Sequence, residues 1–293
     1  MVTFILSAFA DEASPNLDAQ IAALGDAGIG SIELRNVDGK SVKDLTFEEA
    51  RAARKKLDVA GIRVASMGSP FGKIGIQKDF EPHMQEFLHA LSLCHILGCD
   101  LMRVFSFYIP ASDDPETHRA EVVRRMSLML DAAEREGVKL AHENEKGIYG
   151  DTGDRCLILM EELGDRLGLI FDPANFIQVG ESPAEQFPKL EGYLTYMHIK
   201  DALMEDKSIV PSGHGDGSIA DILLAISKRS GEMLLTIEPH LTVFDGLNKL
   251  QGGTLKHRYA YPDAGAAFAA AADALKDVLK QIGYTEGAGV WTR

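Results

Sequence analysis

The sequence contains few cysteines and no long apolar run. Its 293 residues include three cysteines, and an odd, sparse set predicts a reducing, cytoplasmic location rather than a disulfide framework. No stretch reaches the roughly 18 uncharged apolar residues of a membrane span, so no membrane partner is expected. The start, MVTFILSAFADEA, lacks a basic segment and has only a short apolar run, which argues against a signal peptide.

An excess of basic residues is also lacking. The chain has 30 Lys and Arg against 44 Asp and Glu, which gives a formal net charge of −14. Such a surface repels a phosphate backbone, so no nucleic-acid partner is expected. No linker rich in Pro, Gly or Ser interrupts the chain. We therefore expect residues 1–293 to form one domain.

What the sequence does contain is a regular alternation of short apolar runs with amphipathic helical patterns. The runs are apolar on both faces, as parallel strands covered on both sides are. They cover residues 3–9, 31–34, 63–67, 101–105, 138–142, 168–171, 194–199 and 233–237. The helical patterns begin with caps such as the Thr46–Glu49 capping box and end at glycines such as Gly98.

Eight strand–helix units fit the chain and predict an α/β fold, a single (β/α)₈ TIM barrel. A doubly wound open sheet would show the same alternation, but no GxGxxG follows the first strand, where a dinucleotide fold would carry it. The last unit has a long loop at about residues 239–262, which we expect to cover the strand ends. An Ala-rich helix over residues 264–282 then completes the barrel.

Ligand-type residues stand at the ends of the last four predicted strands. They are Glu143, Asp172, His198 and Glu238. In a barrel the C-terminal strand ends face a shared pocket, and carboxylates with one imidazole suit a hard or borderline divalent ion. The sequence therefore predicts one divalent metal held by these residues, Mn²⁺ first, with Mg²⁺, Co²⁺ or Zn²⁺ as alternatives.

Further polar residues near the same strand ends are candidates for substrate binding. Glu145 and Lys200 follow the fifth and seventh strands, and His214 lies in a Gly-rich loop, residues 213–217. The backbone N–H groups of this loop either face substrate oxygens or belong to a flexible turn, and we favour the first interpretation.

The role of three other residues stays open. His142 alternates with Glu143, so regular strand geometry points it into the outer layer, and only a bulge would turn it into the pocket as a candidate base. Glu12 and Glu33 stand near the ends of the first two strands, where substrate contact and loop stabilisation are equally compatible with the pattern.

The motifs HENEKGIYGD, FDPANF, HIKDA, G-x-G-D-G and IEPHL resemble the xylose-isomerase-like barrel superfamily along the whole chain. That superfamily includes ketose 3-epimerases, inosose dehydratase and isomerase, hydroxypyruvate isomerase and the apurinic endonucleases. For the epimerase branch, the resemblance implies the same four metal ligands as above, with Glu143 and Glu238 as the acid/base pair. It also implies that Asn175 contacts the substrate, at a position where relatives commonly have a histidine.

Two departures from the superfamily narrow the expectation. Isomerases that shift a hydride use a lysine two positions after the first metal glutamate, and this chain has Glu145 there. The apurinic endonucleases hold three zinc ions with many more histidines than this sequence offers. The resemblance therefore points away from hydride transfer and from DNA repair.

The sequence as a whole predicts a divalent-metal-dependent sugar isomerase or epimerase. It would transfer a proton next to a carbonyl through a metal-stabilised enediolate, with Glu143 and Glu238 as catalytic groups. The alternative is a lyase or dehydratase of the same barrel family, inosose dehydratase-like or cleaving 3-oxo-glycosides and C-glycosides, with His142 as candidate base. A non-catalytic sugar-binding barrel is disfavoured because no ligand residue is missing. The expected partner is a small sugar or cyclitol, and homo-oligomer formation stays open.

Overall fold

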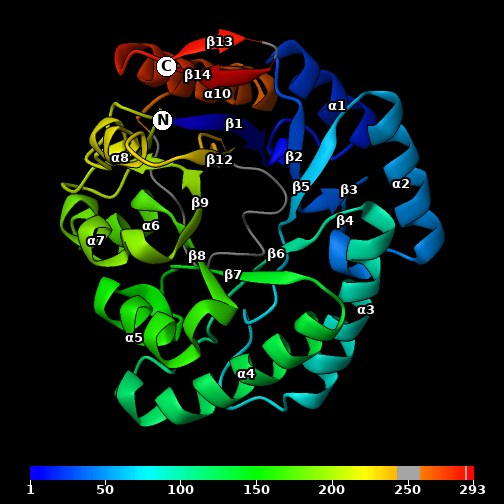
Figure 1. Cartoon of the computed structure of the whole chain (residues 1–293), viewed down its shortest axis with the longest axis vertical. Coiled ribbons are helices and arrows are strands. Elements are labelled where there is room, and N and C mark those ends of the chain that lie inside the picture. The colour runs from blue at the N-terminus through cyan, green and yellow to red at the C-terminus, as the bar shows by residue number, and fades with distance from the viewer. Residues whose placement is uncertain (243–257, 288) are drawn as a thin grey trace.

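Parallel strands form the centre of the computed structural model, which describes residues 1–242, 258–287 and 289–293 (Figure 1). These strands are β1 (Val2–Ala8), β2 (Ser31–Leu34), β5 (Arg63–Met67), β6 (Leu101–Val104), β7 (Lys139–Glu143), β8 (Leu167–Phe171), β9 (Leu194–Ile199) and β12 (Gly231–Ile237). Each lies within two residues of a predicted run. The predicted α/β barrel is confirmed.

Helices surround these strands on the outside (Figure 1). They are α1 (Leu17–Asp26), α2 (Phe47–Val59), α3 (Glu81–Leu97), α4 (Arg119–Arg135), α5 (Gly153–Leu163), α6 (Pro173–Gln178), α7 (Pro183–Leu190), α8 (Ile219–Ile226) and α10 (Ala264–Gln281). The predicted capping box is present, because the Thr46 side chain accepts from Glu49 N–H and Glu49 accepts from Thr46 N–H.

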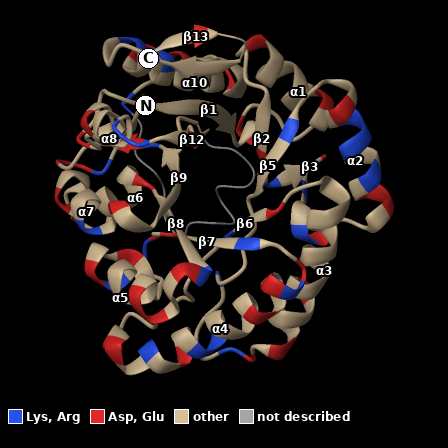
Figure 2. Cartoon of the chain, viewed as in Figure 1, with Lys and Arg blue, Asp and Glu red and all other residues tan. Residues whose placement is uncertain are grey.

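The helices bury one face against the strands and expose the other. In α4 the buried apolar residues recur three or four positions apart, as in Val122, Met126, Met129 and Ala133. Figure 2 shows the charged positions spread over the outer helices, α2, α4 and α5 among them. Most residues of the inner strands are consequently buried, those at the C-terminal strand ends above all, and polar side chains that point inward there must find partners within the protein.

Parallel pairing runs in the order β2–β5–β6–β7–β8–β9–β12–β1. β1 and β2 contact each other, but no ladder between them appears in the described residues. Instead β14 (Val290–Thr292) pairs antiparallel with β1, so that Trp291 lies opposite Phe4, and β13 (Thr285–Gly287) continues the sheet. This C-terminal hairpin, which covers the outer edge of β1, was not predicted from the sequence.

Two small hairpins lie outside the barrel sheet. β3 (Asn36–Val37) pairs with β4 (Lys40–Ser41), and β10 (Asp201–Ala202) pairs with β11 (Ile209–Val210). The predicted long loop over residues 239–262 falls mostly on residues 243–257, outside the described residues. No helix in the described parts of the chain is long and apolar enough to cross a membrane.

Candidate functional site

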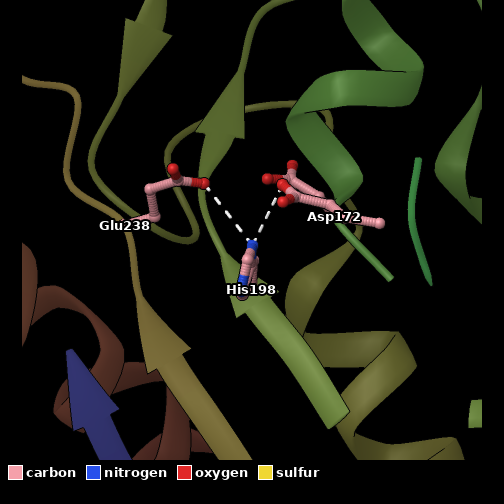
Figure 3. A group of neighbouring side chains, drawn as sticks. Asp172, His198 and Glu238 are labelled. Atoms are coloured by element: carbon pink, nitrogen blue, oxygen red, sulfur yellow. Dashed lines mark ion pairs between the residues drawn. The ribbon is translucent and has the colours of Figure 1, made fainter. Parts of the chain in front are cut away.

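The four predicted ligand residues meet at one point. Glu143 ends β7, Asp172 directly follows β8, His198 lies in β9, and Glu238 directly follows β12. All four side chains are buried, and one ligand atom from each lies within 4.8 Å of the others. Figure 3 shows Asp172, His198 and Glu238 directed toward one another. The parallel barrel produces this convergence because its C-terminal strand ends share one face.

His198 stands at the centre of this cluster. Its Nδ1 is 3.0 Å from Glu143 Oε1 and 3.6 Å from Glu238 Oε2. The other ring nitrogen, Nε2, is 3.2 Å from Glu33 Oε2. Burial lowers the pKa of His198, but the carboxylates of Glu143 and Glu33 outweigh burial and raise it to about 10.

Buried cations flank the glutamates of the cluster. Arg103 Nη1 donates to Glu143 Oε2 at 3.1 Å, and Lys200 Nζ donates to Glu238 Oε2 at 2.9 Å. Burial raises the pKa of Glu143, but the charges of His198 and Arg103 bring it down to about 2. The pKa of Glu238 also falls well below its usual value, because Lys200 and the nearby histidines outweigh burial. Both glutamates are therefore ionised at neutral pH.

Hydrogen bonds to both the backbone and the side chain hold Asp172 in place. Its N–H donates to Asn144 Oδ1 at 2.9 Å, and Asn144 Nδ2 donates back to its carbonyl at 3.0 Å. Its Oδ1 caps α6 by accepting from Asn175 N–H at 3.0 Å. This leaves Oδ2 directed at the cluster, 2.8 Å from Lys200 Nζ. Burial raises the pKa of Asp172 to about 7 against the opposing charge of Lys200.

Two residues predicted to bind substrate have partners within the protein. Asn175 Nδ2 donates to Glu143 Oε1 at 3.1 Å and to the Asn144 carbonyl at 2.8 Å, so the structure gives its amide a part in orienting Glu143. Lys200, as described, bridges Asp172 and Glu238. The sequence could place both residues at strand ends, but it could not show that their contacts are with the ligand residues.

Glu145 and His214 lie outside the four-residue cluster. Glu145 Oε2 accepts from Lys73 Nζ at 2.9 Å, in an ion pair that is largely buried. His214 is exposed, with Nδ1 3.3 Å from the Tyr259 hydroxyl. The structure therefore places His214 at the surface rather than among the ligand residues.

The prediction that the N–H groups of the Gly-rich loop face substrate oxygens is wrong. The N–H groups of Gly213, Gly215 and Gly217 donate to the carboxylate of Asp201, at distances of 2.9–3.1 Å. Ala202 N–H donates to the same carboxylate at 2.9 Å. These N–H groups are used inside the protein, so they do not face substrate oxygens.

His142 has the orientation of a regular strand. The pairing of β7 with β6 and β8 is unbroken at this residue, and His142 Nε2 lies 2.9 Å from Ser106 Oγ. The ring also lies beside Gly150, where a Cβ atom would come within 2.5 Å of His142 Cε1. No bulge turns it into the pocket, which corrects the alternative expectation that it acts there as a base. Burial lowers its pKa to about 4.

Arg35 and Arg103 were not predicted from the sequence as site residues, and the role of Glu12 was open. Arg35 makes two hydrogen bonds to Asp11 and one to Glu12, and its Nη1 reaches Glu238 Oε1 at 3.4 Å. Arg103 lies inside the apolar run that forms β6, where nothing local marks it as a partner of Glu143. The structure thus gives Glu12 a place in the ion-pair network beside Glu238.

A family model described as xylose isomerase-like TIM barrel matches residues 21–286. The chain belongs to the xylose isomerase-like TIM barrel family. This confirms the resemblance that the sequence motifs indicated. No curated protein sequence gives a significant match.

Solved structures share the fold of this xylose isomerase-like barrel. L-ribulose 3-epimerase is 18% identical, with 96% of each chain covered and a TM-score of 0.72. The IOLI protein with a binding zinc atom is 18% identical, with 96% of this chain and 99% of that chain covered and a TM-score of 0.72. The probable 3-DHS dehydratase AsbF from Bacillus anthracis is 15% identical, with 94% and 99% covered and a TM-score of 0.71. At these identities the likeness shows the fold.

The cluster of this xylose isomerase-like barrel fits a divalent cation. Among the described side chains, His198 Nδ1 and Asp172 Oδ2 are buried without an aligned hydrogen-bond partner, although charged groups lie near both. Ligands bound at about 2.0–2.2 Å to one ion lie within about 4.4 Å of one another, and the observed limit of 4.8 Å is close to that. Three carboxylates and one imidazole form a donor set that divalent metals accept.

Proposed function

We propose that this chain is a divalent-metal-dependent sugar isomerase or epimerase. The observation that carries the proposal is the convergence of Glu143, Asp172, His198 and Glu238 from consecutive strand ends of the barrel. Membership of the xylose isomerase-like family and the likeness to L-ribulose 3-epimerase support a small sugar as substrate. Mn²⁺ is our first choice of metal, with Mg²⁺, Co²⁺ or Zn²⁺ as alternatives.

The same four residues would hold the ion. A bound divalent cation supplies electrophilic polarisation of a carbonyl and of the hydroxyl beside it, which makes the adjacent C–H more acidic. The protein would supply the bases. Glu143 and Glu238 approach His198 from different strands, so one carboxylate can accept the proton from carbon and the other can return a proton.

The surroundings of the two glutamates suit this role. Arg103 at Glu143 and Lys200 at Glu238 favour the ionised carboxylates that both ligation and proton acceptance require. Burial keeps bulk water away, so a proton is exchanged mainly with these groups while the substrate is bound. Glu145 stands where hydride-shifting relatives have a lysine, and it pairs with Lys73 instead, which favours the proton route.

A lyase of the same family is the alternative reaction. Loss of a group from the carbon next to the deprotonated one would use the same carboxylates. The version that relies on His142 as base receives no support, because that ring lies against Ser106 and Gly150. We therefore propose isomerisation or epimerisation first.

The experiment is to load the protein with Mn²⁺ and test ketoses, inososes and 3-oxo-glycosides in D₂O. We expect a ketose to be converted and deuterium to appear on the carbon next to the carbonyl. A product that lacks water or a sugar unit would replace the proposal with the lyase alternative. Conversion that retains the substrate hydrogen completely would contradict the two-glutamate proton route.

A further inference from the structure

A hydrogen-bonded chain runs behind His198, on the side away from the other ligand residues. His198 Nε2 lies 3.2 Å from Glu33 Oε2, and the Tyr196 hydroxyl donates to Glu33 Oε1 at 2.9 Å. Ser66 Oγ lies 3.1 Å from the same hydroxyl. All four side chains are fully buried, and they join β2, β5 and β9 across the barrel interior.

Irregular strand pairing places the members of this chain. Ile32 lies opposite Val64, but Glu33 lies opposite Ser66, so β5 has one extra residue at this point. Between β8 and β9, Leu169 lies opposite Leu194 but Ile170 lies opposite Tyr196. Parallel bulges are rare, and bulges often redirect side chains beside functional sites. Here one shift accompanies Glu33 and Ser66, and the other accompanies Tyr196.

Gly168 makes room for the second irregularity. A Cβ atom at Gly168 would lie 2.0 Å from Thr195 Oγ1 and 3.1 Å from Thr195 Cβ. Thr195 is the extra residue of β9, so β8 tolerates it only because residue 168 has no side chain. Gly168 thus permits the irregular pairing that brings Tyr196 to Glu33.

The chemistry of the chain fixes the proton on His198. Glu33 accepts from the Tyr196 hydroxyl at Oε1, and as an acceptor at Oε2 it requires Nε2 to carry the hydrogen. A cation that binds here displaces the second proton of the ring, and in the resulting neutral imidazole the free lone pair is on Nδ1. Nδ1 is the atom that faces Glu143 and Glu238. Glu33 therefore sets both the tautomer and the ring direction that a cation needs.

We propose that Glu33 is a positioning residue that holds His198 ready to bind a divalent cation, with Tyr196 and Ser66 orienting Glu33. The inference rests on the proposed metal site and extends it to residues on β2 and β5. Carboxylates behind a ligating histidine typically change metal affinity about 10–100-fold when they are replaced.

The test measures Co²⁺ binding to protein freed of metal with a chelator. For Glu33→Gln we expect a Kd for Co²⁺ that is about 10–100-fold higher than that of the wild type, and a changed visible absorption spectrum of the bound ion. Equal affinity and an equal spectrum would overturn the role of Glu33 while leaving the metal site intact. A wild-type protein that binds no Co²⁺ would instead overturn the proposed function, and this inference with it.

Asp201→Asn is the matched control. It too removes one buried negative charge just beyond β9, but the partners of Asp201 are backbone N–H groups. We expect its Kd for Co²⁺ to stay at the wild-type value. An equal loss in both variants would assign the effect to charge or stability and overturn the proposal.

If the Glu33→Gln protein does not fold, Tyr196→Phe tests the same proposal. The change removes only the hydroxyl that donates to Glu33 Oε1 and contacts Ser66. We expect a severalfold weaker affinity for Co²⁺, smaller than the effect at Glu33. Unchanged affinity and an unchanged Co²⁺ spectrum in this variant would contradict the proposal.

Discussion

Asp172 and Asp201 both follow parallel strands closely, and both are buried, yet their carboxylates meet different partners. The Asp201 oxygens accept from four backbone N–H groups, those of Ala202, Gly213, Gly215 and Gly217. Asp172 uses Oδ1 to cap α6, and its Oδ2 faces the side chains of the cluster.

The difference separates a structural carboxylate from the carboxylate that we propose as a metal ligand. Backbone N–H groups saturate Asp201 and leave no oxygen directed at a cation, so Asp201 organises a loop. Asp172 keeps one oxygen directed at His198, Lys200 and Glu238. Its N–H and its other oxygen form hydrogen bonds that fix the orientation of the side chain. Position after a strand is common to both residues, and the type of hydrogen-bond partner distinguishes them.

The largest effect is expected at the two glutamates of the ligand cluster. In Glu143→Gln and Glu238→Gln a ligand oxygen remains but the base is lost. On the sugar identified in D₂O, each change should lower kcat by at least about 10²-fold, the lower end of general acid–base contributions. Metal content must be measured on the same samples, because loss of the ion would imitate the loss of a base. Near-normal turnover with metal retained in both variants would refute the two-base mechanism.

The aspartate pair offers the most direct comparison. Asp172→Asn should weaken Mn²⁺ binding by more than the roughly 10–100-fold typical of a residue behind a ligand. Asp201→Asn should leave Mn²⁺ affinity unchanged and lower the free energy of unfolding by about 1–3 kcal/mol, because Asn keeps one acceptor oxygen and two of the four backbone N–H groups lose theirs. Calorimetric titration and urea unfolding measure the two quantities. Reversed effects would mean that the two carboxylates had been assigned the wrong roles.

An effect on stability alone is expected from the loop around Asp201. A Cβ atom at Gly215 would lie 2.3 Å from Asp201 Oδ1 and 2.6 Å from the Ala202 carbonyl oxygen. Gly215→Ala should therefore destabilise the fold by about 1–3 kcal/mol, as overpacking does, with Mn²⁺ affinity retained. Gly192→Ala is a suitable control, since nothing lies within 4 Å of a Cβ there. A Gly215→Ala protein of normal stability but weakened metal binding would place this loop in the metal site.

The strands and the convergence of the four proposed ligand residues could be predicted because both depend on local pattern. Apolar runs mark buried strands, and a ligand-type residue at a strand end needs only the barrel rule to reach the shared pocket. The sequence therefore indicated where Glu143, Asp172, His198 and Glu238 would meet. The hairpin of β13 and β14 was not predicted, because strands of three residues are too short to show a period.

The hydrogen-bond partners of these residues could not be predicted, because those contacts join side chains on different strands of the barrel. Tyr196 and Arg103 stand in apolar runs and resemble ordinary strand residues, and only the register of the folded sheet shows that they contact Glu33 and Glu143. The Gly-rich loop could be recognised as a source of backbone N–H donors. Nothing in the sequence indicated that Asp201 would be their acceptor.

The most direct test of the account is the metal content of His198→Ala beside the wild type. Both proteins are stripped with a chelator, reloaded with Mn²⁺ and dialysed, and the bound metal is measured by mass spectrometry. The account predicts about one Mn²⁺ per wild-type chain and strongly reduced occupancy in His198→Ala, because the only imidazole of the four-residue cluster is lost. Wild-type occupancy in the His198→Ala protein would contradict it.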